Sequence, residues 1–463
     1  MSTVCSSRFF VGLCFLVLFH GSLAQLPGRL SGRSECQIEQ ITAREPNRRQ
    51  VSEAGFSEFW DSGENEELDC AGVQVVRHTI NPKGLLLPCY PNTHELVYVV
   101  RGEGLQGTVL PGCAETSEGG TDKHQRVYRY REGDILALPA GAVHWTYNHA
   151  DKPVVLVALR DTSNVANQLD RNFRKFFLAG NPQSQMPQGK GHQGKQQQRP
   201  SWSEPKEHEG FNMYAGFDDG ILQQVFDVEY EIVSQLKGFN DDRGLIVLAE
   251  YLHVLVPEEG EERRRDDNWI EQTICSTQLS ANIGSPVGAD VYNPRGGRIS
   301  RLNSHKLPVL ESLQLSAERG VLYKNAVLAP HYNLNAHSII YITSGNSRLQ
   351  IVGNDGSAVF DGEVQEGQLI VVPQDFAVIK KAGEEGCEWV AFKTNDNAIT
   401  MQLAGRFSYI RALPEDVLVN SYNISPEEAR NLKYNRKEGV VLSPRSRSPL
   451  KEAQNALLNT LFG

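Results

Sequence analysis

Short apolar segments separated by glycine and proline turns dominate two long stretches of the chain. The segments of the first stretch lie at 96–112, 131–148 and 153–161, and those of the second lie at 339–353, 365–383 and 387–396. Many of their residues are β-branched or aromatic, and short runs of this kind bounded by Gly or Pro are typical of β-strands. The pattern therefore predicts two β-rich modules.

The two stretches match each other at constant spacing. Tyr98 corresponds to Tyr341 and Gly102 to Gly345, and both pairs are 243 residues apart. A Glu-Gly pair and a proline also recur at a common spacing of 234 residues. A period of this length indicates the tandem duplication of a whole module, because the repeats of solenoid proteins are much shorter.

A helical segment follows each β-rich stretch, at 224–237 and at 420–433. The two segments share four matched pairs that are all 196 residues apart, namely Phe226/Tyr422, Glu231/Glu427, Leu236/Leu432 and Lys237/Lys433. Ser425, Pro426 and Glu428 have the spacing of a capping box with proline in the first turn, which predicts a helix beginning at Pro426.

Apolar side chains are expected on the helices of both modules. We assign Phe173, Phe176, Phe177 and Leu178 to a helix of the first module, and Ile410, Leu413 and Val417 to a helix of the second. A helix pair that extends from a barrel cannot bury such residues alone, so a neighbouring subunit is expected to cover them.

The N-terminus has the pattern of a secretory signal peptide over residues 1–24. Arg8 supplies the positive charge, 9–19 is apolar, and small residues precede the expected cleavage between Ala24 and Gln25. A membrane anchor is the alternative, but the apolar run is shorter than the roughly 20 residues needed to span a bilayer. We expect a mature chain that leaves the membrane and folds in an oxidising compartment.

Six cysteines remain after that cleavage: Cys36, Cys70, Cys89, Cys113, Cys275 and Cys387. An oxidising compartment favours disulfides, but six cysteines allow many pairings, and the residues alone do not choose among them.

Two polar segments interrupt the predicted modules. The first module spans 25–256 and contains 181–210, a Gln-, Gly- and Pro-rich segment that we expect to be a disordered insertion. The charged run 257–268 reads as a solvated linker or as an exposed target for proteases. The second module follows at 269–437, and a C-terminal tail occupies 438–463.

Composition restricts the class of function. The formal net charge is −10 at pH 7, which disfavours nucleic-acid binding because phosphate contacts need a basic surface. The chain contains 30 Arg against 16 Lys, together with 55 Asn and Gln. These side chains are rich in nitrogen, and no core or active site requires so many of them.

The first stretch contains the second signature motif of the cupin superfamily. The residues that carry it are Gly133, Pro139, Gly141, His144 and Asn148. The motif implies a mainly β fold of two tandem cupin modules, which are jelly-roll β-barrels, each followed by a small helical extension. In the second module Gly367 and Pro373 remain, but Asp375 replaces the glycine and Val378 replaces the histidine.

The first cupin motif is incomplete in both modules. Glu95 takes the place of its glutamate, Cys89 and Pro91 stand where two histidines belong, and Lys83 replaces a glycine. The corresponding residues of the second module are His331, Asn333 and Ser338.

Divalent metal oxygenases of this superfamily need about three imidazoles and one carboxylate on the metal. Neither module supplies that set, so we expect no metal, no cofactor and no catalytic residue. His144 and His331 are expected to be hydrogen-bonded side chains near the barrel mouths. The alternative is a vestigial copper site on Cys89, Glu95 and His144 in a metal- or ligand-binding bicupin.

The whole chain after residue 24 resembles the legumin-type (11S) seed storage globulins, which are two-cupin proteins. The segments that carry the resemblance are 35–36, 68–72, 84–88, 111–113, 271–275, 335–338, 388–396 and 428–436. The resemblance implies a nutrient reservoir without enzymatic activity, delivered through the endoplasmic reticulum to the protein storage vacuole. It also implies trimers that stack into hexamers, alone or with other storage globulin subunits, and a family that includes many food allergens.

The resemblance further implies two disulfides, Cys36–Cys70 within the first module and Cys113–Cys275 between the modules. Cys89 and Cys387 lie outside that framework. Besides signal peptidase and vacuolar proteases, an asparaginyl endopeptidase is implied to cut after Asn268. Here Trp269 follows where the family has glycine, and a bulky residue restricts a scissile backbone. We therefore expect a largely uncut chain.

Overall fold

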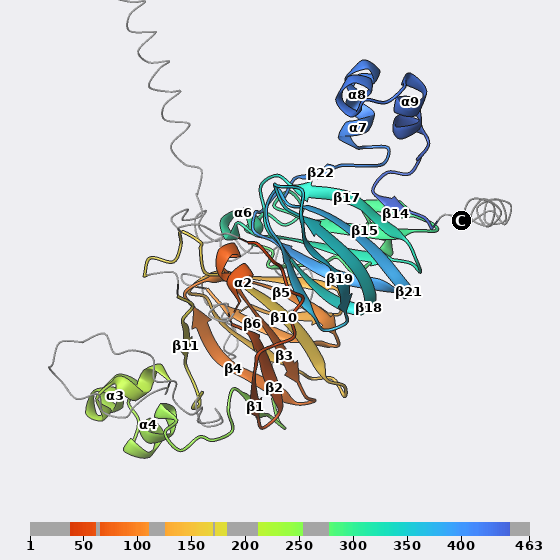
Figure 1. Ribbon diagram of the computed structural model, residues 1–463. Helices are drawn as coiled ribbons and strands as arrows, with labels where there is room; N and C mark the ends of the chain where they lie inside the picture. The colour runs from red at the N-terminus through yellow and green to blue at the C-terminus, as the bar shows by residue number, and fades with distance from the viewer. Residues whose placement is uncertain are drawn as a thin grey trace, which may run out of the picture.

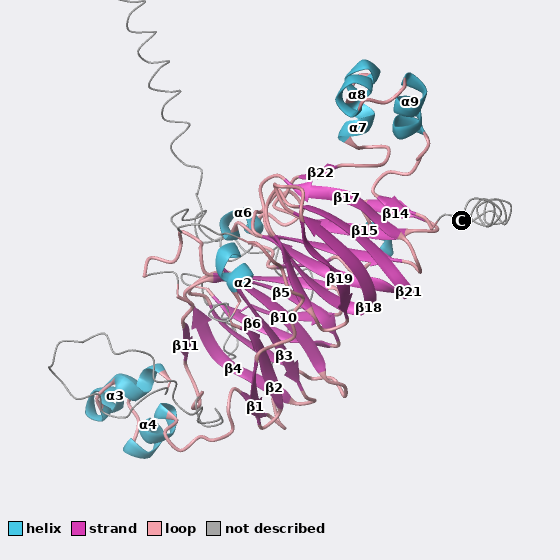
Figure 2. Cartoon of the chain, viewed as in Figure 1, coloured by secondary structure: helices cyan, strands magenta, loops and turns pink. Residues whose placement is uncertain are grey.

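The computed structural model describes residues 38–61, 65–110, 126–169, 172–182, 212–252 and 277–444. Figure 1 shows two β-barrels side by side, the first coloured red to yellow and the second green to blue, with a helical group extending from the outer end of each. In Figure 2 strands make up most of both barrels. The structure confirms the predicted mainly β fold of two jelly-roll modules, each followed by a helical extension.

The first barrel is built from two antiparallel sheets. Its elements are β1 (Arg48–Ser52), β2 (Gly55–Trp60), helix α2 (Glu66–Ala71), β3 (Val73–Ile80), β4 (Gly84–Pro91), β5 (His94–Arg101), β6 (Glu103–Val109), β7 (Arg126–Arg131), β8 (Asp134–Leu138), β9 (Val143–Tyr147), β10 (Val154–Asp161), β11 (Lys175–Phe177) and β12 (Ile246–Leu248). One sheet has the order β1-β2-β3-β10-β5-β8-β13, where β13 is Ser280–Asn282, and the other has the order β11-β4-β9-β6-β7 with β12 beside β4.

The second barrel repeats this arrangement with longer strands. Its elements are β13 (Ser280–Asn282), the short helix η4 (Pro286–Gly288), β14 (Val291–Asn293), β15 (Gly297–Leu302), helix α6 (Val309–Leu313), β16 (Ser316–Leu322), β17 (Val327–Asn333), β18 (Ser338–Val352), β19 (Ala358–Gln365), β20 (Leu369–Val372), β21 (Ala377–Lys393), β22 (Thr400–Gln402) and β23 (Val441–Leu442). The main path is β14-β15-β16-β21-β17-β22, and β18 pairs with β19, β20 and β21.

Alternate residues of the matched strands β5 and β18 face two different cores. Tyr98 and Tyr341 belong to a cluster of buried side chains that lies between the barrels. Their neighbours Val97 and Ile340 belong to the separate clusters inside the first and the second barrel. Side chains of a strand alternate between its two faces, so these apolar runs are covered on both sides, and the two barrels share one core.

The two modules also exchange strands and backbone hydrogen bonds. Strand β13 comes from the predicted second module but pairs with β8 of the first barrel. In the opposite direction, Ile41 packs in the core of the second barrel, and Arg44 donates its N–H to the carbonyl of Leu369. Strand β23 pairs with β17, so the second module continues past the predicted boundary at residue 437.

Two helical groups with the same local structure extend from the barrels. The first consists of η2 (Met213–Gly216), α3 (Asp219–Phe226) and α4 (Tyr230–Lys237), and the second of α7 (Tyr409–Ala412), α8 (Glu415–Tyr422) and α9 (Pro426–Tyr434). In each group a buried lysine of the last helix donates to a backbone carbonyl just before the middle helix. Lys237 donates to Phe217, and Lys433 donates to Leu413. The spacing of 196 residues holds for both donor and acceptor. The predicted helix start at Pro426 is confirmed, with Ser425 and Glu428 forming the capping box.

The predicted helix around Phe176 is wrong. Residues Lys175–Phe177 form strand β11, which pairs with β4 at the edge of a sheet, and Phe176 stacks on Tyr90 with ring centroids 4.9 Å apart. Short apolar runs do not distinguish strand from helix. Here the unpaired edge of β4 offers hydrogen bonds that select the strand. Of the second predicted set, Ile410 lies on α7, Val417 on α8, and Leu413 between them.

Several predicted features fall outside the described residues. They are the signal peptide 1–24 with its cleavage between Ala24 and Gln25, most of the insertion 181–210, the linker 257–268, the bond between Asn268 and Trp269, and three of the cysteines, Cys36, Cys113 and Cys275. Within the described ranges, no helix has the length and apolar character that crossing a membrane would require.

Replacing Gly320 by Ala is expected to destabilise the second barrel by about 1–3 kcal/mol, because overpacking a dense core forces side chains from their preferred rotamers. An added Cβ at this position of β16 would lie 1.9 Å from the ring of Trp389. The matched control is Gly216→Ala, where a Cβ meets no atom within 4 Å. Chemical denaturation of both variants tests this, and equal midpoints would contradict it.

Candidate functional site

The structure brings Cys89, Glu95 and His144 together inside the first barrel. They come from β4, β5 and β9, and all three are buried. The Sγ atom of Cys89 lies 3.7 Å from Nε2 of His144, and Oε2 of Glu95 lies 3.8 Å from the same nitrogen. The first-module candidates therefore form one cluster around the imidazole.

Arg160 is the member of this cluster that sequence reasoning missed. It lies opposite Glu95 in the pairing of β10 with β5, and its Nε donates to Oε1 of Glu95 at 2.8 Å. The ring of Phe173 covers the guanidinium at 4.1 Å. The only sequence signal is a single arginine inside the apolar run of β10, which indicates a buried charge with a partner.

The buried cluster is strongly polarised. Burial opposes ionisation of Glu95, but Arg160, Lys175 and His144 outweigh it and lower the pKa of Glu95 to about 2. Burial alone would raise the pKa of the Cys89 thiol, yet Lys175 and His144 bring it below its usual value. The pKa of His144 is raised despite burial because Cys89 and Glu95 favour its charged form. Cys89 and His144 thus each favour the charged form of the other, beside the ion pair of Arg160 and Glu95.

This arrangement does not have the donor set of a metal centre. Arg160 already binds one oxygen of Glu95. Among the described residues, no group of three or more His, Cys, Asp or Glu side chains is placed so that it could hold a metal ion. The third ligand position of the motif is Pro91, which has no donor side chain. A copper site would need more imidazole ligands than the barrel offers.

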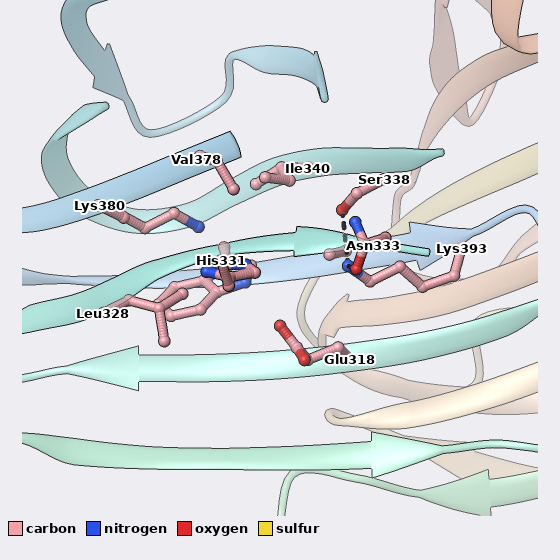
Figure 3. A pocket seen from close by; sticks show the side chains of 11 residues that line it. Glu318, Leu328, His331, Asn333, Ser338, Ile340, Val378, Lys380 and Lys393 are labelled. Atoms are coloured by element: carbon pink, nitrogen blue, oxygen red, sulfur yellow. Dashed lines mark hydrogen bonds between the residues drawn. The ribbon is translucent and has the colours of Figure 1, made fainter. Parts of the chain in front are cut away.

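In the second barrel, His331, Asn333 and Ser338 line a small internal cavity. The sequence missed its charged members, Glu318, Lys380 and Lys393 (Figure 3). His331 has its Nδ1 at 2.9 Å from the carbonyl oxygen of Ala329. Burial lowers the pKa of His331 to about 4, and the lysines add to this effect. The imidazole is therefore neutral at physiological pH. Its Nδ1 makes the kind of hydrogen bond that the sequence analysis expected for this side chain.

The cupin motif residues that remain act on the backbone. Gly133 and Gly141 have φ angles of 85° and 77°, which favour glycine. Asn148 donates from Nδ2 to the carbonyls of Ile80 and Lys152 at 2.9 and 2.8 Å. Lys83 replaces a motif glycine and keeps a φ of 63°. The motif is thus retained for its turns, while two of the positions that bind metal in the superfamily have changed to Cys89 and Pro91.

Comparison with known proteins identifies the family. The family model described as Cupin matches residues 41–184 and 281–430. An 11S globulin subunit beta of Cucurbita maxima is 46% identical, covering 95% of this chain and 98% of that protein. A seed storage 11S globulin of Anacardium occidentale, Ana o 2.0101, is also 46% identical, covering 96% and 100%. The chain belongs to the 11S globulins of the cupin family. The crystal structure of pumpkin seed globulin matches it with a TM-score of 0.79 and 46% identity, over 89% of this chain and 100% of that one.

The cysteines of this 11S globulin fall into two groups. Cys70 is disulfide-bonded, and its predicted partner Cys36 lies outside the described residues, as do both cysteines of the predicted Cys113–Cys275 bridge. Cys89 and Cys387 are free thiols and are buried in the first and the second barrel. Cys89 is buried despite its lowered pKa, so access to its sulfur limits its reaction with large reagents.

The two free thiols of the folded 11S globulin are expected to resist a bulky disulfide reagent, and to react once the chain is unfolded without reductant. A thiol titration of the mature protein before and after addition of guanidinium measures this. Two thiols released on unfolding agree with the two predicted disulfides, whereas fast labelling of the native protein at Cys89 would contradict the buried placement.

Proposed function

We propose that this 11S globulin is a nutrient reservoir of the seed, without catalytic activity, that accumulates as nitrogen-rich protein and is degraded at germination. The proposal rests on one observation: in both barrels, residues have changed at the place where the superfamily binds metal. Arg160 pairs with Glu95 in one barrel, and Lys393 and Ser338 occupy the corresponding place in the other. The fold is retained while neither barrel keeps the full ligand set of the metal-binding cupins, and close relatives are named as seed storage proteins.

The abundance of the chain through seed filling and germination tests this proposal. Heavy accumulation followed by loss after imbibition is expected, because a reservoir is made in bulk and then consumed. A scarce chain whose level stays constant would overturn the storage function. Metal analysis of the purified protein addresses the rival bicupin, since a functional ligand set would retain a stoichiometric metal through purification.

The proposal includes delivery through the endoplasmic reticulum to the protein storage vacuole, after signal peptidase cleaves between Ala24 and Gln25. It also includes the pairings Cys36–Cys70 and Cys113–Cys275. For the bond between Asn268 and Trp269, we propose that an asparaginyl endopeptidase leaves most chains uncut. A reduced denaturing gel that shows one band near the full mass supports this, and a smaller fragment beginning at Trp269 would refute it.

We further propose that the helical groups join subunits into trimers, which stack into hexamers or combine with other storage globulin subunits. The support lies in the apolar side chains that the helices expose in a single chain. On α3, Ile221 and Val225 are 59% and 68% exposed, and they are four residues apart on one helical face. On α8 and α9, Val417 and Leu432 are 41% and 54% exposed. Exposed apolar patches of this kind mark interaction surfaces.

Replacing Ile221 by Asp is expected to convert the assembly to single chains, because a buried unpaired carboxylate at an interface costs several kcal/mol. Light scattering after size-exclusion chromatography measures the mass. The control is Val51→Asp on the edge strand β1, where Val51 is 53% exposed and belongs to the barrel and not to a helical group. A trimer that survives Ile221→Asp would contradict the proposed interface.

A further inference from the structure

The cavity of the second barrel contains more positive than negative groups. Lys380, Lys393 and His331 line it together with a single carboxylate, that of Glu318. Arg301 donates from Nε to Oε2 of Glu318 at 3.0 Å. This carboxylate therefore also forms an ion pair with a cation that does not line the cavity. No other Asp or Glu is among the residues that line the cavity in the described chain. One negative charge therefore faces two lysines in the cavity and Arg301 beside it, while His331 is neutral at physiological pH.

One position where the two barrels differ contributes to this excess. In the first barrel Glu95 lies opposite Arg160 across paired strands, and in the second barrel Ser338 lies opposite Lys393 in the same relation. The duplicated module has kept a cation on β21 and replaced its carboxylate by a hydroxyl. Lys393 now donates to Oγ of Ser338 at 2.9 Å and to Oδ1 of Asn333 at 3.3 Å. Neither of these acceptors carries a charge.

One hydrogen-bond donor at this end of the cavity, Nδ2 of Asn333, has no acceptor within the described residues. An ammonium group only donates, so Lys393 fixes the amide of Asn333 with Oδ1 towards itself. Nδ2 of Asn333 is then buried and has no hydrogen-bond partner within the described chain. The hydroxyl of Ser338 accepts from Lys393. An unpaired buried donor costs about 1–3 kcal/mol, which favours an acceptor in the cavity.

Lys380 approaches the same cavity from the other end, as Figure 3 shows. Its Nζ lies 3.5 Å from the centroid of the Trp389 ring, and no hydrogen bond within the described residues holds it. Burial lowers the pKa of Lys380 to about 8, so the ammonium is charged at neutral and acidic pH. The donors of this ammonium are therefore available to a group in the cavity.

We propose that the second barrel binds one monatomic anion of chloride size in this cavity, beside Nδ2 of Asn333 and facing Lys380, at the place where metal-binding cupins hold a cation. The cavity has room for about one water molecule, which excludes a carboxylate ligand or a phosphate. A halide accepts from several donors at once and offsets the buried positive charge. A water molecule could accept one or two of these bonds, but it would leave the charge uncompensated.

Bromide replacement in crystals of the mature protein tests the site directly. Diffraction data collected at the bromine absorption edge are expected to show one anomalous peak per second barrel, inside the cavity and within hydrogen-bond reach of Nδ2 of Asn333. The first barrel, where Glu95 supplies the negative charge, is expected to show none. A cavity without an anomalous peak, or with a water molecule in bromide-grown crystals, would overturn the proposal.

Thermal unfolding supplies the test in solution. The Tm of the mature protein is expected to be about 2–4 °C higher in sodium chloride than in sodium gluconate of equal ionic strength, because a ligand of the native state raises Tm. Ser338→Asp places a carboxylate where Glu95 stands in the first barrel, and it is expected to abolish the chloride dependence without lowering Tm in gluconate. Lys324→Met, which removes an exposed lysine, is the control that retains the dependence.

The two variants separate the anion site from general salt effects. If Ser338→Asp folds and still gains the full chloride shift, the anion binds elsewhere and the proposal fails. If Lys324→Met loses the shift as well, the effect belongs to the surface charge and not to the cavity. Neither outcome affects the storage function, which is tested by abundance in the seed.

Discussion

Replacing Glu95 by Gln is expected to lower the free energy of unfolding by about 3–5 kcal/mol, the cost of breaking a buried ion pair by removing one partner. The change keeps the shape of the side chain but leaves Arg160 charged inside the first barrel. Both side chains are about 3–4% exposed, so water cannot replace the lost carboxylate. Chemical denaturation of the mature protein measures the difference in midpoint.

The control for this prediction is the exposed pair of Arg348 and Asp361. Its geometry is as good, with Nε 2.8 Å from Oδ1, and the pKa of Asp361 is also lowered to about 2 by Arg348. Asp361 is solvated, however, and exposed pairs contribute little because water and salt screen them. Asp361→Asn is expected to leave the midpoint nearly unchanged. A similar loss in both variants would show that burial is not the cause.

The same ion pair predicts a response to acid. The pKa of Glu95 is about 2 in the folded chain, below its unfolded value, so the folded state binds the proton less readily. The contribution of Glu95 to stability is therefore complete above the unfolded pKa and is lost as the pH falls towards 2. The stability of Glu95→Gln should fall less steeply over this acidic range than that of the unmodified protein.

Replacing Trp389 by Ala is expected to cost about 3–5 kcal/mol, as for other buried tryptophans. Trp389 on β21 is 1% exposed and fills the second barrel against Gly320 and Lys380. The substitution removes the packing and also the aromatic face that holds the Lys380 ammonium, so a cavity and a less compensated charge arise together. The Tm of the variant measures the effect.

Tyr251→Ala provides the matched comparison, because Tyr251 is a large aromatic residue that is 87% exposed. Surface substitutions usually change stability by less than about 0.5 kcal/mol. Trp389→Phe is expected to fall between the two, since it keeps an aromatic face over Lys380. If Trp389→Ala and Tyr251→Ala unfold at the same temperature, Trp389 does not support the barrel.

The repeat in the sequence was sufficient to predict the architecture. Tyr98 and Tyr341 recur because each must fill the shared core, and a required packing position leaves a visible pattern. The segment around Phe176 was predicted incorrectly because its strand conformation depends on the edge of β4, more than 80 residues away. Local periodicity carries no information about such a partner.

The candidate sites were predictable only in part for the same reason. Cys89, Glu95 and His144 were found because a family motif fixes their spacing. Arg160 was missed because its partner Glu95 is 65 residues away, and only the strand pairing places them opposite each other. Lys393 and Glu318 were missed likewise, since a single charged residue in an apolar strand does not reveal which cation or anion it faces.

The buried lysines have a consequence for digestion. Lys237, Lys380, Lys393 and Lys433 hold helices and barrel walls together through their ammonium groups, and all four are buried. A trypsin-like enzyme needs the lysine side chain in its specificity pocket and an extended backbone around it. In the intact fold the peptide bonds after these four lysines are inaccessible to the enzyme, so early tryptic peptides will end at other residues. Peptides that end at these lysines will appear only after the modules unfold. The time at which each peptide is released will therefore show when the helical group or barrel that contains its lysine unfolds.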